Sequence, residues 1–435
     1  MQGLLSNSLG SKASIFGDPG MQINGNLYET NAGQALSAGD FVGLYPTCTS
    51  GSLTYISTVA SSAHSIILPL ATGKALAIYY QNTVLYAHIL TISGTSITVG
   101  ERTNLMSGSI TEVKATVLSD SLVAVTYVNS GNPYLFAISI SGSALSVGNA
   151  TILYTPPSSM GNIEIVVLTE TIVLVAGNVS AQNYLYTMVC SISGLTVTCL
   201  TIDTPITGFA MNYITLSKLT PTKVFIGITD GSNQRGVAYL LTVGQDNHVV
   251  GGSSGIAFTA NERTDYIKSA VISGNRIIAV YRGASSVCLM ATVFYFDGTS
   301  FTTWSIPITL STETTVIPKG CVTISPNQIF VFNQWGASGW TYGIIISVYG
   351  INSIQKKVAI CISPNNPVYG SVCSVGNNSV LVFYINDSNY YSCAAMVSGA
   401  SKAKKLSAVT AGGEFIDGVA KSAAITDGKV QIYMP

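Results

Sequence analysis

The stretch LYAHILTISGTSITVG, residues 85–100, holds two runs rich in apolar and β-branched residues, joined by a turn at Gly94. It returns as YLFAISISGSALSVG at 134–148 and as LYTMVCSISGLTVTCL at 185–200. Weaker copies follow at 238–252, 290–304, 342–356 and 390–406. The glycines at or near the seven turns lie 48, 52, 50, 54, 52 and 49 residues apart: Gly94, Gly142, Gly194, Gly244, Gly298, Gly350 and Gly399. A near-constant interval of this length indicates a repeat architecture.

A second shared phrase precedes each copy and consists of a short turn followed by a β-branched run. Examples are ATGKALAIYY at 71–80 and LTETIVLVAG at 168–177, and a further strand such as IEIVVLT at 163–169 leads into each of these turns. One repeat therefore holds four strands, and no stretch shows the 3.6-residue apolar period of a helix. Seven such repeats predict an all-β fold, a seven-bladed β-propeller of four-stranded antiparallel blades. A β-solenoid is the main alternative, but it prefers shorter repeats and parallel strands.

The composition fits blades that are buried on both faces. Of the 435 residues, 47% are hydrophobic and only 9% are charged, with 19 basic and 19 acidic side chains. Faces packed between blades cannot hold unpaired ions, which explains the scarcity of charge. A nucleic-acid partner is not expected, because binding phosphate requires an excess of basic residues. No run of 18 apolar residues exists, so we expect no membrane insertion, and the start MQGLLSNSLGSKAS does not resemble a secretion signal.

The two ends of the chain do not follow the repeat. Residues 1–37 are rich in Gly, Asn and Ser and predict an extended N-terminal arm. Residues 38–60 and 413–435 each predict short strands, and they flank the propeller at 61–412. Because the first and last blades of a closed propeller are neighbours, we expect these two segments to pair into a small β module.

Some of these phrases resemble a known class of proteins. The pattern LY-x5-ISGT-x-ITVG and the ending GVAKSAAITDGKVQIYMP at 418–435 resemble repeat-rich virion proteins of tailed bacteriophages and prophages of Gram-positive hosts. The likeness covers about residues 38–435 and is sharpest in the first three repeats and at the C-terminus. It implies a tail-fibre, host-recognition or decoration protein of the virion, made in the host cytoplasm, and it carries no catalytic motif.

Residues that could support chemistry are sparse. The three histidines, His64, His88 and His248, do not have metal-ligand spacing, and no cofactor or metal is predicted. The eight cysteines form no CxxC motif; Cys190 and Cys199 are expected opposite each other on a hairpin, and whether they form a disulfide stays open. Five carboxylates are expected to be solvated loop residues: Glu112, Asp120, Glu164, Glu170 and Asp203. We therefore predict that the chain is not an enzyme.

The hairpins between the second and third strands of the blades carry the candidate contacts. All of them should emerge on one face, and Asn, Ser, Gly, Tyr and Trp dominate their sequences, as in antibody paratopes. The residues chosen as candidate ligand contacts are Trp335, Trp340, Tyr342, Asn183, Tyr184, Asn389, Tyr390 and Arg235. Because Gly and Asn also make good turns in any β protein, an ordinary structural role is the alternative for each of them.

The sequence therefore predicts a bacteriophage structural protein that displays a propeller for attachment to the host surface. Its partners would be other virion proteins, through the arm and the module, and a host-surface glycan or protein. A capsid or tail decoration protein without a receptor is the alternative, and a carbohydrate-active enzyme is a more distant one.

Overall fold

The computed structural model describes the parts of the chain that build the fold. These are residues 27–32, 41–59, 62–71, 73–179, 182–252, 255–259, 264–272, 275–283, 288–303, 307–311, 316–325, 327–335, 339–349, 353–364, 366–376, 379–386, 392–405, 418–420 and 429–433. They form strands β1 to β35 and no helix, so the predicted all-β class is confirmed. Two compact units are present, Ser50–Ser398 and the pair of segments Met1–Thr49 and Gly399–Pro435.

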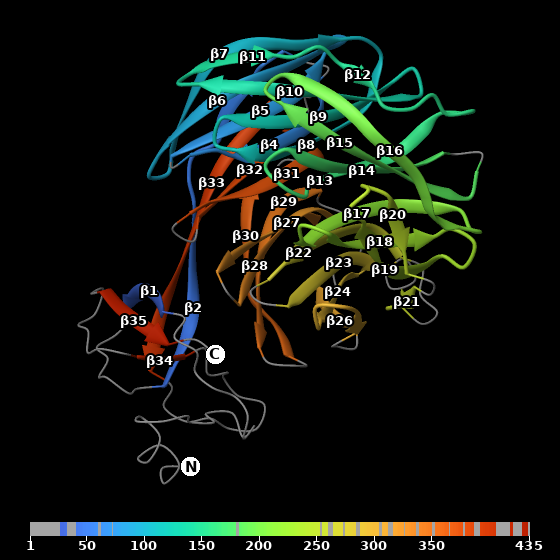
Figure 1. Cartoon of the computed structure of the whole chain (residues 1–435). Coiled ribbons are helices and arrows are strands. Elements are labelled where there is room, and N and C mark those ends of the chain that lie inside the picture. Colours follow the sequence, from blue (N-terminus) through green and yellow to red (C-terminus); the bar gives the residue numbers. More distant parts are fainter. Residues whose placement is uncertain are drawn as a thin grey trace. The chain divides into compact units, whose positions relative to one another are not determined.

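The larger unit is a seven-bladed β-propeller, as predicted (Figure 1). In each blade the strands follow one another antiparallel, from the first strand to the last. Blade 1 consists of β4 (Ser62–Pro69), β5 (Lys74–Gln81), β6 (Val84–Ser93) and β7 (Ser96–Ser107). Blade 2 consists of β8 (Ile110–Ser119), β9 (Leu122–Asn129), β10 (Asn132–Ser141), β11 (Ala144–Val147) and β12 (Thr151–Ile152). Blade 3 consists of β13 (Met160–Val167), β14 (Ile172–Val179), β15 (Tyr184–Ser193) and β16 (Thr196–Thr207).

Blades 4 to 6 repeat this plan, and two of them split their outer strand. Blade 4 consists of β17 (Met211–Thr220), β18 (Lys223–Asp230), β19 (Arg235–Val243), β20 (Val249–Gly251) and β21 (Ile256–Ala257). Blade 5 consists of β22 (Thr264–Val271), β23 (Arg276–Gly283), β24 (Leu289–Phe296), β25 (Phe301–Thr303) and β26 (Ile308–Ser311). Blade 6 consists of β27 (Ile317–Ser325), β28 (Gln328–Trp335), β29 (Trp340–Tyr349) and β30 (Ser353–Ser363).

Blade 7 is completed by a strand from the other end of the chain. Its first three strands are β31 (Pro367–Gly376), β32 (Ser379–Asn386) and β33 (Ser392–Lys405), and β3 (Thr54–Ser57) pairs with β33 as the fourth. The sequence assigns residues 54–57 to the terminal module, whereas they close the propeller. Gly399 is predicted at a turn, but it lies inside the 14-residue strand β33, so the prediction of a turn in the seventh repeat was wrong.

The core lies between the blades. The second strands are buried almost throughout; β5, for example, reads KALAIYYQ and has six buried residues out of eight. Separate apolar clusters fill the spaces between successive blades, and one of them joins blade 7 to blade 1 through Ile56, Tyr79 and Phe383. A blade face is therefore covered by its neighbour rather than by water, which is why a chain with so little charge forms this fold.

The turns between third and fourth strands show why glycine recurs at the repeat interval. Gly94, Gly142 and Gly194 have φ values of +59°, +65° and +57°, a conformation that residues with a Cβ rarely adopt. On the hairpin closed by Gly194, Cys190 and Cys199 pair across β15 and β16 as expected, and both are free thiols.

The first strands of the blades form the innermost ring. Each of β4, β8, β13, β17, β22, β27 and β31 lies beside the first strands of both neighbouring blades. The first strands therefore surround the central channel, a point that the sequence does not decide.

The smaller unit joins segments from both ends of the chain. It contains β1 (Leu27–Ala32), β34 (Gly418–Ala420), β35 (Lys429–Tyr433) and most of β2 (Phe41–Ser50). In it, β1 runs antiparallel to β35, β35 pairs with β34, and β34 pairs with β2.

Candidate binding site at the mouth of the central channel

Every first strand has a β-bulge near its beginning. At each bulge the register of pairing with the second strand shifts. From blade 1 to blade 7, the residues on either side of the shift are Ala63/Ser65, Ile110/Glu112, Gly161/Glu164, Asn212/Thr215, Asp265/Lys268, Pro318/Gly320 and Pro367/Tyr369. A bulge takes residues out of the regular alternation and redirects their side chains. Four residues at these bulges have φ between 48° and 55°: His64, Asn162, Tyr213 and Tyr266. The mouth of the channel is therefore lined by irregular backbone, which ordinary strand alternation does not predict.

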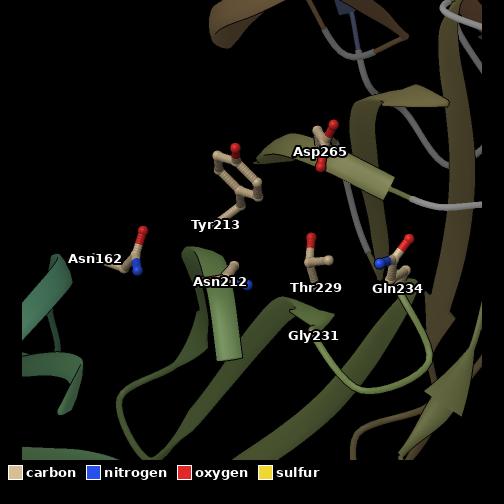
Figure 2. A pocket seen from close by; sticks show the side chains of 7 residues that line it. All are labelled: Asn162, Asn212, Tyr213, Thr229, Gly231, Gln234 and Asp265. Atoms are coloured by element: carbon tan, nitrogen blue, oxygen red, sulfur yellow. The ribbon is translucent and has the colours of Figure 1, made fainter. Parts of the chain in front are cut away.

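A cavity of about 280 Å³ opens beside these bulges in blades 3 to 5 (Figure 2). Its lining comes from β13, β17, β18, β22 and the hairpin between β18 and β19, and consists of Asn162, Asn212, Tyr213, Thr229, Gly231, Gln234 and Asp265. All of these residues except the glycine carry a side chain that can form hydrogen bonds, and most can both donate and accept. The cavity is therefore suited to a small ligand that is itself rich in hydroxyl or amide groups.

The hairpin that forms one wall is held in place by Asp230. This carboxylate, which is 4% exposed, accepts hydrogen bonds from the backbone N–H of Ser232 (2.9 Å) and of Asn233 (3.2 Å), and from the Asn233 side-chain amide (2.8 Å). Arg235 adds an ion pair, with its Nε 3.9 Å from Asp230 Oδ2. Asp230 and Arg235 therefore fix the loop, and Arg235 does not line the cavity as a ligand contact.

The opposite wall is built around Asp265. Its carboxylate is 2% exposed and accepts a hydrogen bond of 2.7 Å from Arg282, whose guanidinium lies 4.8 Å from the centre of the Tyr266 ring. The rings of Tyr266 and Tyr213 are 4.7 Å apart. Burial, aided by the neighbouring Tyr266 and Asp265, raises the pKa of Tyr213 to about 12, further above neutral pH than the ordinary value of 10.0.

Charged side chains gather deeper in the ring of first strands. Glu112 and Lys114 lie on β8, Glu164 on β13, Lys268 on β22 and Lys319 on β27. Lys114 donates a hydrogen bond to Glu164. Glu112 accepts the backbone N–H groups of Asn162 and Ile163, at 2.8 and 2.7 Å, and so holds the bulge of the next blade. The expectation that Glu112 and Glu164 are solvated loop residues is therefore wrong.

The sequence did not single out the cavity residues or the lysines, although one signal was present. In a chain with 9% charged residues, a charge inside an apolar first strand is unusual, as in VKATV (113–117), IEIVV (163–167) and IKSAV (267–271). Because a buried charge is retained only when it is paired or has a role, a charge in such a strand indicates an ion pair or a functional group.

The structure brings three of the predicted contact residues together on the hairpin between β28 and β29. Trp335 and Trp340 pair across the strands, and the Tyr342 ring lies 4.3 Å from the Trp335 ring and 6.4 Å from the Trp340 ring. Trp335 also packs against the core between blades 5 and 6, whereas Trp340 is 41% exposed. Trp340 therefore offers an exposed ring, and Trp335 supports the hairpin.

The other predicted contacts do not join this cluster. Asn183 and Tyr184 lie at the hairpin between β14 and β15, where Tyr184 is 40% exposed and its ring is 6.4 Å from that of Tyr186. Arg235 lies beside Asp230, as described above. Asn389 and Tyr390 fall outside the described residues.

Comparison with known proteins identifies no family. No family model and no curated protein matches the chain. Solved structures that it resembles include a protein from Lactobacillus plantarum (TM-score 0.48, 13% identity, covering 68% of this chain and 85% of that one). Another is the oligogalacturonate lyase from Vibrio parahaemolyticus (TM-score 0.48, 9% identity, covering 83% of this chain and 98% of that one). A third is the K499G mutant of the NanB sialidase from Streptococcus pneumoniae (TM-score 0.46, 9% identity, covering 86% of this chain and 70% of that one).

These matches correct one prediction. The chain was expected not to be an enzyme because residues that could support chemistry are sparse. That expectation does not stand, because the solved structures that the chain resembles include a lyase and a sialidase. At 9–13% identity no substrate and no residue role is transferred from them. The resemblance to phage virion proteins stays a prediction. Among the described residues, no helix is long and apolar enough to cross a membrane.

Proposed function

We propose that the chain is a virion protein of a tailed bacteriophage that attaches the particle to the host surface, and that the cavity between blades 3 and 5 binds a sugar of a surface glycan. The virion setting is supported by the sequence resemblance at residues 85–200 and 418–435. The observation that carries the binding role is the cavity itself, which combines amides, hydroxyls and a neutral phenol in about 280 Å³.

The size and the lining of the cavity favour a single sugar unit. Pockets for drug-sized ligands begin at about 300 Å³, so this cavity suits a smaller group. A sugar hydroxyl both donates and accepts hydrogen bonds, as do the side chains of Asn162, Asn212 and Gln234 that face it (Figure 2). The exposed ring of Trp340, on a hairpin between second and third strands like the one that walls the cavity, could stack on a further unit of the same glycan.

The test measures binding of the purified chain to fractionated host envelopes and to glycans released from them. Asn212→Ala and Tyr213→Phe each remove one hydrogen-bonding group from the cavity, and each should weaken binding about 5- to 10-fold, as expected for loss of one hydrogen bond. Asn183→Ala is the matched control, because this exposed asparagine lies on the hairpin of blade 3 and does not line the cavity.

Two outcomes would contradict the proposal. Failure of the unmodified chain to bind any host fraction would remove the attachment role and favour decoration of the particle. Binding that is lost in Trp340→Ala but unchanged in both cavity variants would move the site to the aromatic hairpin.

A further inference from the structure

The central channel holds more positive than negative charge. Seven charged side chains come from the first strands of five blades: Glu112, Lys114, Glu164, Lys218, Asp265, Lys268 and Lys319. The charges of Lys114 and Glu164, on blades 2 and 3, influence the pKa of Lys268 on blade 5. Four lysines therefore share the first strands with two glutamates and one aspartate.

Both glutamates are already engaged. Glu164 accepts a hydrogen bond from Lys114, and both oxygens of Glu112 accept backbone N–H groups of blade 3. Although burial opposes it, the carboxylate of Glu164 holds the pKa of Lys114 above its ordinary value, as expected for a matched ion pair. The charge of Lys114 is therefore balanced locally.

Lys268 and Lys319 have no such partner. Lys319 donates to a neutral acceptor, the carbonyl of Val368, at 2.9 Å. Within the described ranges, the ammonium of Lys268 makes neither a hydrogen bond nor an ion pair. Each of the two side chains is only partly exposed. Two partly buried lysines on neighbouring first strands thus have no carboxylate paired with them.

The other titratable groups near them do not supply the missing charge. Burial raises the pKa of Cys321 to about 12, so this thiol on β27 is uncharged at neutral pH. Asp265 on β22 is paired with Arg282. Burial, followed by the charge of Lys114, lowers the pKa of Lys268 to about 8, and burial followed by the charge of Lys268 lowers that of Lys319 to about 8. The surroundings of the two lysines therefore disfavour a charge that an anion would stabilise.

We propose that the central channel binds an oxyanion, a phosphate or carboxylate group, between the ammonium groups of Lys268 and Lys319. Each ammonium offers up to three N–H donors, and hydrogen bonds between charged partners are about twice as strong as neutral ones. This site is separate from the cavity and does not depend on the proposed function. The anion is either a free ion or the charged group of a larger ligand.

Isothermal titration calorimetry on the full chain tests the proposal, with inorganic phosphate and glycerol phosphate as the two probes. Titrations at about pH 8 in two buffers of different ionisation enthalpy should show proton uptake on binding, because the anion raises both lysine pKa values. Binding of inorganic phosphate alone would assign the site to a free ion. Equal or tighter binding of the ester would assign it to the charged group of a larger molecule.

The variant Lys268→Gln/Lys319→Gln should bind either probe at least tenfold more weakly, whereas Lys74→Gln, a lysine on the second strand of blade 1, should bind like the unmodified chain. Absence of heat and of proton uptake in the unmodified chain, or equal affinity in the double variant, would overturn the proposal. The proton uptake is measured on the unmodified chain, so it decides the question even if the double variant does not fold.

Discussion

Mild acid should destabilise the propeller through His64. This residue lies in the bulge of β4, with its ring 4.9 Å from the ring of Tyr369 and 6.2 Å from that of Tyr80. Burial, with a smaller contribution from the charge of Lys114, lowers the pKa of His64 from 6.5 to about 4. The folded chain thus holds His64 neutral in a range of pH where the unfolded chain binds a proton.

The sign and the size of the effect follow from this difference. The stability that neutral His64 contributes is complete above the unfolded pKa of 6.5 and is lost as the pH falls toward the folded pKa of about 4. Between about pH 7 and pH 5 the loss is about 2 kcal/mol, from the proton binding of the two states.

The assay is urea unfolding of the unmodified chain and of His64→Asn at about pH 7 and pH 5. Asparagine does not titrate and tolerates the positive φ of 49° at this position. His88, whose pKa burial also lowers, and His248, whose pKa is raised by the hydrogen bond that it donates to Asp203, contribute equally to both chains and cancel. If both chains lose the same stability on acidification, His64 is not held neutral by the fold and the reasoning fails.

Three further expectations concern the stability of the fold. Phe225→Ala, at a fully buried ring in the core between blades 4 and 5, should lower the free energy of unfolding by about 3–5 kcal/mol in a denaturant titration. Ile56→Ala should lower the free energy of unfolding by about 2–4 kcal/mol, because Ile56 belongs to the core that closes the ring. Val59, which is 47% exposed, is the control, and Val59→Ala should change that free energy by no more than about 0.5 kcal/mol. Equal effects of the two variants would mean that β3 does not close blade 7. Gly94→Ala should cost about 1–2 kcal/mol for the backbone alone, since a Cβ there meets no atom within 4 Å, and Gly94→Asn should cost less.

The blades could be predicted because their determinants are local and repeated. The turn glycines Gly94, Gly142 and Gly194 have a positive φ, and the second strands have apolar residues on both faces. The prediction was wrong where the repeat breaks, at Gly399, because β33 continues past the position of the turn. The role of residues 54–57 could not be read from their own sequence, because it is decided by pairing with a strand at the far end of the chain.

The candidate site could not be predicted because it does not repeat. One position of the first strands, which pairs with the fifth residue of the second strand, holds a charged residue in blades 2, 3 and 5 but Thr215 and Gly320 in blades 4 and 6. The charged residues there are Lys114, Glu164 and Lys268. Its chemistry arises from contacts between residues about 50 positions apart, which no local pattern records. The aromatic hairpin was found because Trp335, Trp340 and Tyr342 are neighbours in both sequence and space.

The pairing of β3 with β33 also constrains how the chain can be made. Thr54 pairs with Ala394, about 340 positions later, so β3 leaves the ribosome long before the strand with which it pairs. Until then, six blades can form only an open arc whose end blades expose apolar faces, a state that favours aggregation. During synthesis, a chain of this kind therefore depends on fast closure of the ring, or on a chaperone that covers the apolar faces of the two end blades until the ring closes.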